Sequence, residues 1–128
     1  MYATLERPVA ERPVKIPGPD HRIDIAPNPH RVVVWVDGRV IADTRDALTL
    51  REQHFGTVHY IPRKDVKMDR LARTSHSTHC PFKGDASYFS LKGGPENAAW
   101  SYETPYDEMT AIKGYLAFYP NKVTIEAE

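Results

Sequence analysis

An Asp-Gly pair between two strand-like runs restricts the fold of this chain more than any other feature. The runs are RVVVWV at 31–36 and RVIADT at 39–44, and Asp37 and Gly38 lie between them. A two-residue type I′ turn needs a positive φ at both central residues, which Asp-Gly tolerates well. The sequence therefore predicts an antiparallel hairpin over residues 31–44, and with it a fold built on β-sheet.

Further segments have strand-like content and are bounded by turn residues. They are 47–52, 57–62, 65–72, 86–91, 98–102 and 122–127. Apolar and polar residues alternate in 65–72 only at first, and a strand is favoured there over a helical turn. Together with the hairpin, these segments predict about eight strands in a meander.

One segment has the signals of a helix, at about 105–113. Thr104 is suited to the N-cap, a proline occupies the first helical position, and Gly114 stands where a left-handed residue ends many helices. Met109 and Ile112 are three apart, so they share a face that can pack on the sheet. The predicted class is mostly β (α+β), with this one short helix.

The first 30 residues differ in composition from the rest. Six of the eleven prolines fall there, and each fixes φ and removes a backbone donor. We expect residues 1–30 to form an extended, partly polyproline-like arm that lies on the domain or on a partner, with disorder as the alternative. A chain of 128 residues then leaves a single β-rich domain at 31–128.

Charge and cysteine content exclude several classes of protein. Lys plus Arg equals Asp plus Glu at 17 each, which argues against general binding of nucleic acid. The basic run Arg63, Lys64, Lys67, Arg70 and Arg73 is interrupted by Asp65 and Asp69 and is read as a solvated face. No apolar run is long enough for a membrane span and the start has no apolar signal region, so we expect a cytoplasmic protein. With Cys80 as the only cysteine, an intrachain disulfide and a four-cysteine zinc site are both excluded.

Reactive side chains are densest at 76–88. Cys80 is a candidate nucleophile and His79 a candidate base, but in an extended segment their side chains point to opposite faces. The candidates for a partner of Cys80 are therefore His76, Tyr88, His54 and His59. The alternative, which we favour, is that Cys80 is a small buried apolar residue.

A metal site is a second hypothesis for the same stretch. The candidate ligands are His76, His79 and Cys80, with His54, His59 or Asp85. Imidazole and thiolate suit zinc, but the spacing is unspecific and no second ligand pair is present. We therefore expect no metal and no cofactor.

The Lys83-Gly84-Asp85 turn is better suited to binding a ligand. Gly84 permits a positive φ, Lys83 offers a charge for phosphate or carboxylate, and Asp85 can orient the lysine or a ligand hydroxyl. Trp100 and Tyr102 share one face of their segment and could form a stacking wall. A solvated turn and ordinary core packing are the alternatives for these two features.

Long stretches of the chain resemble domain-of-unknown-function family 427, which is sometimes filed under a nucleotidyltransferase label. The resemblance rests on HCPFKGDASYFSL at 79–91, with 97–108 and 112–123, and extends upstream through 30–52 and 58–71. It implies a compact domain of folded, tent-like sheets, similar to methionine sulfoxide reductase B. This chain lacks the CxxC pairs that bind zinc in those relatives, and it has neither a Gly-Ser motif with paired Asp residues nor a glycine-rich phosphate loop.

The resemblance also indicates which positions recur in the motif. These are His79, Cys80, Lys83, Gly84, Asp85, Tyr88, Trp100 and Tyr102. We expect the domain to bind a small polar or anionic ligand, with Lys83 and Asp85 as a polar clamp and Trp100 or Tyr102 as an apolar wall. The alternatives are an enzyme that uses Cys80 or His79, and a structural or protein-interaction module; a homodimer is compatible with the edge strands and the arm.

Overall fold

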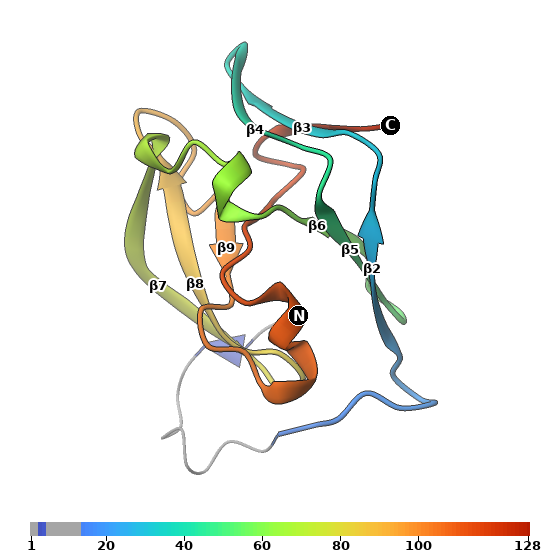
Figure 1. Ribbon diagram of the computed structural model, residues 1–128. Coiled ribbons are helices and arrows are strands. Elements are labelled where there is room, and N and C mark those ends of the chain that lie inside the picture. Colours follow the sequence, from blue (N-terminus) through green and yellow to red (C-terminus); the bar gives the residue numbers. More distant parts are fainter. Residues whose placement is uncertain (1–2, 5–13) are drawn as a thin grey trace.

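The computed structural model describes residues 3–4 and 14–128, and within these ranges the strands form three antiparallel sheets (Figure 1). The first has the order β1-β7-β8-β9-β10, with β1 at Ala3–Thr4, β7 at Leu71–Cys80, β8 at Gly84–Leu91, β9 at Ala99–Ser101 and β10 at Ala117–Phe118. The second has the order β11-β3-β4, with β11 at Thr124–Ala127, β3 at Val32–Val36 and β4 at Arg39–Thr44. The third has the order β2-β5-β6, with β2 at Ile23–Asn28, β5 at Ala47–Glu52 and β6 at Gly56–Tyr60. The mostly β class is confirmed.

The β3–β4 hairpin has the predicted turn. Asp37 and Gly38 both have positive φ, at 49° and 75°. The β5 strand covers the predicted residues 47–52, and β6 and β8 each begin one or two residues before their predicted starts. Local turn chemistry and alternation therefore located most strands.

The predicted single meander is wrong. β4 does not pair with β5; β5 pairs instead with β2, and β3 pairs with β11 from the end of the chain. Consecutive strands do pair within β3–β4, within β5–β6 and along β7 to β10, but these three groups do not join into one meander. In Figure 1, β2, β5 and β6 lie on one side of the molecule and β7, β8 and β9 on the other. Two sheets therefore flank the region between them.

β2 comes from the proline-rich segment, which was predicted as an extended arm. Its Pro27 lies opposite Leu48 of β5, and β2 is an edge strand, where a missing backbone donor is tolerated. The remainder of the predicted arm includes residues 1–2 and 5–13, which lie outside the described residues. Whether that part lies on the domain or on a partner stays a prediction.

The strand predicted at 65–72 is wrong except at its last two residues, which begin β7. The chain there forms two 3₁₀ helices, η2 at Arg63–Asp65 and η3 at Met68–Arg70, before β7 begins. Val66, between them, makes only an isolated bridge with Ala42 of β4. The alternation that suggested a strand ends at Met68, where the backbone turns.

The predicted helix at 105–113 is a 3₁₀ helix, η4, at Asp107–Ile112, with non-helical backbone at Met109. Its N-cap is Tyr106 and not Thr104, because the backbone N–H of Tyr106 donates to the Lys83 carbonyl at 3.0 Å and holds this stretch extended. Met109 and Ile112 are both buried, as their spacing predicted.

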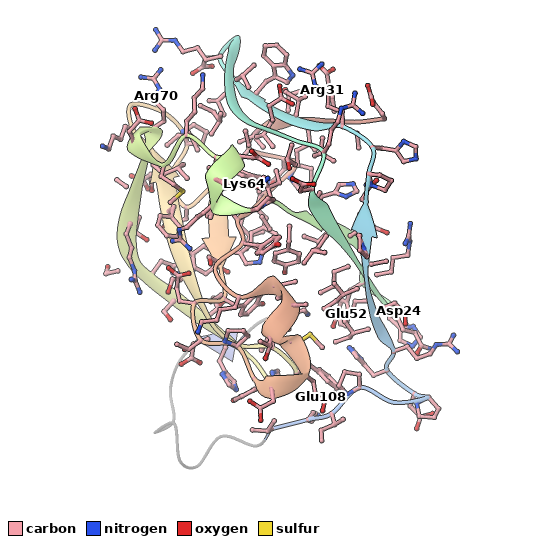
Figure 2. All side chains as sticks on the ribbon, viewed as in Figure 1. Asp24, Arg31, Glu52, Lys64, Arg70 and Glu108 are labelled. Atoms are coloured by element: carbon pink, nitrogen blue, oxygen red, sulfur yellow. The ribbon has the colours of Figure 1, made fainter. Side chains whose placement is uncertain are left out.

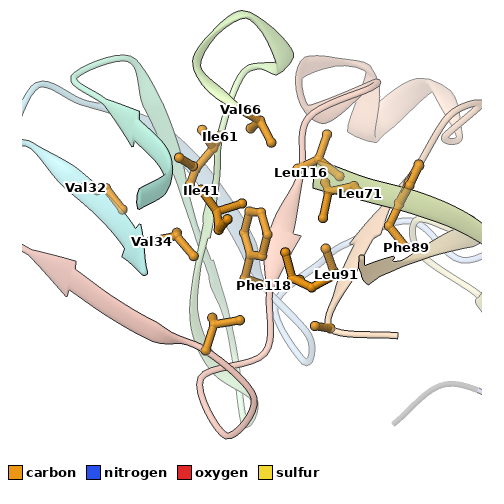
Figure 3. Packing of buried hydrophobic residues seen from close by; sticks show 14 of the residues in the cluster. Val32, Val34, Ile41, Ile61, Val66, Leu71, Phe89, Leu91, Leu116 and Phe118 are labelled. Atoms are coloured by element: carbon orange, nitrogen blue, oxygen red, sulfur yellow. The ribbon is translucent and has the colours of Figure 1, made fainter. Parts of the chain in front are cut away.

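The buried apolar residues form two clusters. The first packs Val32, Val34 and Ile41 of the hairpin against Leu71, Phe89 and Leu91 of the large sheet, with Phe118 between them (Figure 3). The second is rich in aromatic residues and includes Tyr60, Tyr88, Trp100 and Tyr102. The candidate functional site lies against this second cluster.

A charged pair ties η2 to the segment after β9. The guanidinium of Arg63 donates to both carboxylate oxygens of Glu103, at 2.8 and 2.9 Å, and Ser101 Oγ donates to Glu103 at 2.7 Å. The Arg63 hydrogen bonds hold the pKa of Glu103 below its usual range. The pair is only partly exposed, with 37% and 29% of the two side chains accessible.

We expect Glu103→Gln to lower the free energy of unfolding by about 1 kcal/mol near neutral pH, because hydrogen bonds to a charged carboxylate are lost. A lowered folded-state pKa stabilises the fold above the unfolded pKa of about 4.3, and this contribution disappears as the pH falls through the folded pKa. The difference in the free energy of unfolding between wild type and variant should therefore be largest at neutral pH and should disappear in acid. Urea unfolding across this pH range measures it, and a gap that is constant with pH would contradict the assignment.

Candidate functional site

A cavity of about 520 Å³, called here the aromatic pocket, lies between the sheet of β5 and β6 and the sheet of β7, β8 and β9. Its aromatic lining residues are Tyr60 of β6, Tyr88 of β8, Trp100 of β9, Tyr119 and Phe55. Pairing places Tyr88 directly opposite Trp100, so adjacent strands present two rings on one face. The register of the sheet therefore places these two rings side by side, and together with the other rings they form the aromatic wall of the pocket.

The rings of the wall are held by one another. Trp100 Nε1 donates to the Tyr60 hydroxyl at 3.3 Å, and the Trp100 ring lies 4.5 Å from the ring of Tyr119. The hydroxyls of Tyr88 and Tyr119 are 3.1 Å apart, and Thr78 Oγ1 is 3.0 Å from the Tyr88 hydroxyl. Burial raises the pKa of Tyr60 and of Tyr119, so these phenols stay neutral near pH 7. The wall offers flat apolar faces with a few neutral hydroxyl groups.

Two buried charged residues, Glu52 and Lys83, also line the pocket. Lys83 Nζ donates to Glu52 Oε1 at 2.5 Å, and His21 Nε2 lies 2.7 Å from Glu52 Oε2. The His21 ring stacks on Phe82 at 4.0 Å. Figure 2 shows Glu52 beside Asp24, where β5 and β2 lie side by side. The positive charge of Lys83 is therefore compensated by the Glu52 carboxylate.

The predicted site residues are only partly brought together. Lys83, Tyr88 and Trp100 line the aromatic pocket, whereas Tyr102 is fully buried in the cluster behind it. Asp85 does not converge with Lys83 on this pocket, because its carboxylate bonds His79 Nδ1 at 2.8 Å. The structure thus does not form the Lys83–Asp85 clamp that the turn suggested.

Gly84 has a structural reason to be glycine. Its φ is 108°, and a Cβ there would lie 3.6 Å from the backbone of Thr104, Pro105 and Tyr106. The residue lets β8 begin directly against the chain that leads into η4.

His79 and Cys80 lie on different sides of β7, as alternation predicted. His79 is buried against Asp85 and the ring of Tyr106, and Cys80 Sγ lies 3.8 Å from Lys83 Nζ. The sequence-based candidates for the partner of Cys80 did not include Lys83, although it is three residues from Cys80 in the chain. A turn at 81–83 brings them together. Cys80 is 4% exposed and does not line the aromatic pocket.

We expect the Cys80 thiol to resist alkylation in the folded protein, because a reagent cannot reach a buried sulfur. Iodoacetamide treatment followed by intact mass measurement tests this, with modification expected only after urea is added. Rapid modification of the native protein would contradict the buried position and would favour thiol chemistry.

The histidines considered as metal ligands are dispersed. His76 contacts the Tyr88 ring edge-on at 4.4 Å, and His59 Nδ1 lies 3.1 Å from Thr49 Oγ1. Burial lowers the pKa of His59 and favours its neutral form. Within residues 14–128, no three His, Cys, Asp or Glu side chains are placed to share a metal ion. The expectation of no metal and no cofactor stays a prediction.

Sequence reasoning missed the pocket residues that come from β5, β6 and the segment after β10. Tyr60 and Glu52 lie well before the 76–88 stretch in the chain, and Tyr119 follows β10, a strand of two residues that was not predicted. One signal was available for Glu52. It shares a strand face with Leu48 and Leu50, so it was placed on an apolar face where a carboxylate needs a partner.

Comparison with known protein families decides where the chain belongs. The family model described as a domain of unknown function (DUF427) matches residues 24–128. The chain belongs to the DUF427 family. No curated protein matches the chain. The part of this DUF427 protein that the structure describes contains no helix long and apolar enough to cross a membrane.

The matched range contains every described residue of the aromatic pocket. It begins within β2 and includes β5 to β10 and the HCPFKGD stretch. Membership in the DUF427 family gives no activity, so the function must be argued from the pocket.

Proposed function

We propose that this DUF427 domain binds a small, flat, polar organic molecule in the aromatic pocket. The observation that carries the proposal is the wall of Tyr60, Tyr88, Trp100 and Tyr119 around a cavity of about 520 Å³. This volume is within the range of small-molecule sites, which are mostly apolar with a few polar groups. Flat rings gain by stacking on such walls.

The polar groups of the pocket favour a neutral ligand over an anion. Lys83 is bonded to Glu52, and Glu52 also contacts His21, so the lysine charge is already compensated. An anionic ligand would need to displace Glu52 or share the lysine with it. Thr78 and the tyrosine hydroxyls supply neutral donors and acceptors for orientation. Of the small polar or anionic ligand expected from the sequence, we therefore retain the polar ligand and not the anionic one.

Binding of two ring probes, adenine and indole, tests the proposal by isothermal titration calorimetry. Val58→Phe adds a ring from the half-buried pocket lining, whereas Val40→Phe makes the same change at a half-buried position on β4 away from this pocket. We expect at least one probe to bind, with about ten-fold weaker affinity in Val58→Phe and little change in Val40→Phe. Thermal unfolding of each variant checks that it folds.

Two outcomes would overturn the proposal: no saturable binding of either ring, or equal affinity in both variants. Tyr119→Leu, which removes a half-buried ring of the wall, provides a second test if Val58→Phe fails to fold. It should weaken binding by loss of stacking.

A further inference from the structure

A second cavity, of about 600 Å³, adjoins the aromatic pocket and has a different lining; we call it the hydroxyl cavity. Its polar side chains are Thr74, Ser75, Ser77, Ser90, Glu96 and Asn97. His76 lines both cavities and contacts Tyr88 of the aromatic wall. The two cavities are therefore neighbours that meet at one side chain.

An irregularity in β7 creates the hydroxyl cavity. Arg73 pairs with Phe89 and Ser77 pairs with Ser87, so residues 74–76 lie opposite Tyr88 alone. Such a bulge redirects side chains out of the regular pleat. Here it directs a cluster of small polar residues to the edge of the aromatic wall.

Hydrogen bonds hold the lining in place. Thr74 Oγ1 donates to Asn97 Oδ1 at 2.7 Å, and the backbone N–H of Asn97 donates to Ser90 Oγ at 2.9 Å. Asn97 itself has a positive φ of 48°. Lys122 Nζ donates to the backbone carbonyl of Glu96 at 2.6 Å and lies 5.9 Å from the Tyr119 ring, which ties this loop to the aromatic pocket. The relative position of the two cavities is thus fixed by contacts.

The chemistry of the hydroxyl cavity suits a neutral polyhydroxyl group. Hydroxyl and amide side chains both donate and accept, which matches sugar hydroxyls. Among the described residues no Lys or Arg side chain lines the cavity, and the Glu96 carboxylate disfavours phosphate.

We propose that the ligand of this domain is a flat ring joined to a neutral sugar, with the ring in the aromatic pocket and the sugar in the hydroxyl cavity. A nucleoside and an aryl glycoside share this chemistry. The inference rests on the proposed function, since the ring occupies the site argued there, and it adds the substrate class and a second subsite.

Calorimetry with matched probes on the full chain tests the inference. Adenine, adenosine and adenosine monophosphate form one series, and indole with indoxyl β-glucoside forms the other. We expect the sugar to improve affinity by about ten-fold in at least one series, as a few added hydrogen bonds would. The monophosphate should bind no more tightly than adenosine. The series in which the sugar improves affinity shows whether the ligand resembles a nucleoside or an aryl glycoside.

Variants locate the sugar. Ser75→Phe adds bulk from an exposed residue of the hydroxyl cavity, and Thr124→Phe makes an equivalent exposed change on β11. The first should remove the gain from the sugar while leaving ring affinity unchanged, and the second should change neither. Glu96→Lys, also exposed, is the second variant and should make the monophosphate bind more tightly than adenosine.

The outcomes separate this inference from the proposed function. If rings bind and the sugar adds nothing in either series, or if the gain survives Ser75→Phe, the inference is overturned and the proposed function stands. Tighter binding of the monophosphate to the wild-type protein overturns the neutral-ligand argument. If no ring binds, both proposals fail.

Discussion

Lys83→Met is expected to lower the free energy of unfolding by about 3–5 kcal/mol, because it leaves a buried carboxylate without its cation. Lys83 is 1% exposed and Glu52 is 7% exposed, so water does not replace the lost partner. The remaining contact of Glu52, to the half-buried His21, replaces the lysine only in part. Equilibrium unfolding in urea measures the change.

Two further variants separate the buried pair from a general effect of removing a lysine. Lys92→Met removes an exposed lysine and should change stability by no more than about 0.5 kcal/mol. The double variant Glu52→Leu with Lys83→Met removes both charges and should recover much of the stability, since apolar replacement of a buried pair is often neutral. A single Lys83→Met variant as stable as Lys92→Met would refute the buried pair.

Phe118→Ala is expected to cost about 3–5 kcal/mol, because it leaves a cavity where the sheets meet. Phe118 is 4% exposed and lies between the hairpin residues Val34 and Ile41 and the Leu91 side of the large sheet (Figure 3). Phe55→Ala is the matched control, since Phe55 is 46% exposed and should cost well under 1 kcal/mol. Thermal and urea unfolding compare the two, and equal losses would show that Phe118 does not join the sheets.

Features that depend on neighbouring residues were predictable from the sequence. The positive φ values at Asp37 and Gly38 and the strand over 47–52 follow from turn chemistry and short-range alternation. The partners that lie far away in the sequence were not predictable in this way. β5 pairs with β2 and β3 pairs with β11, and these choices depend on tertiary packing between segments distant in sequence.

The site was predictable to the extent that one sequence segment contains it. The motif directed attention to Lys83, Tyr88 and Trp100, which do line the aromatic pocket. Asp85 and His79 belong to the same motif, but they bond each other and do not line the pocket. Tyr60 and Glu52 reach the pocket because β5 and β6 face the large sheet, an arrangement that no local pattern encodes.

The indole N–H signals of the two tryptophans give the most direct test of ring binding in the aromatic pocket. Trp100 lines this pocket, and Trp35 of β3 lies away from it. In a nitrogen-labelled protein titrated separately with adenosine and with indoxyl β-glucoside, the Trp100 indole signal, assigned with a Trp35→Phe variant, should shift saturably with at least one of them while the Trp35 signal stays in place. An unmoved Trp100 signal in both titrations, or a shift of Trp35 alone, would contradict the account.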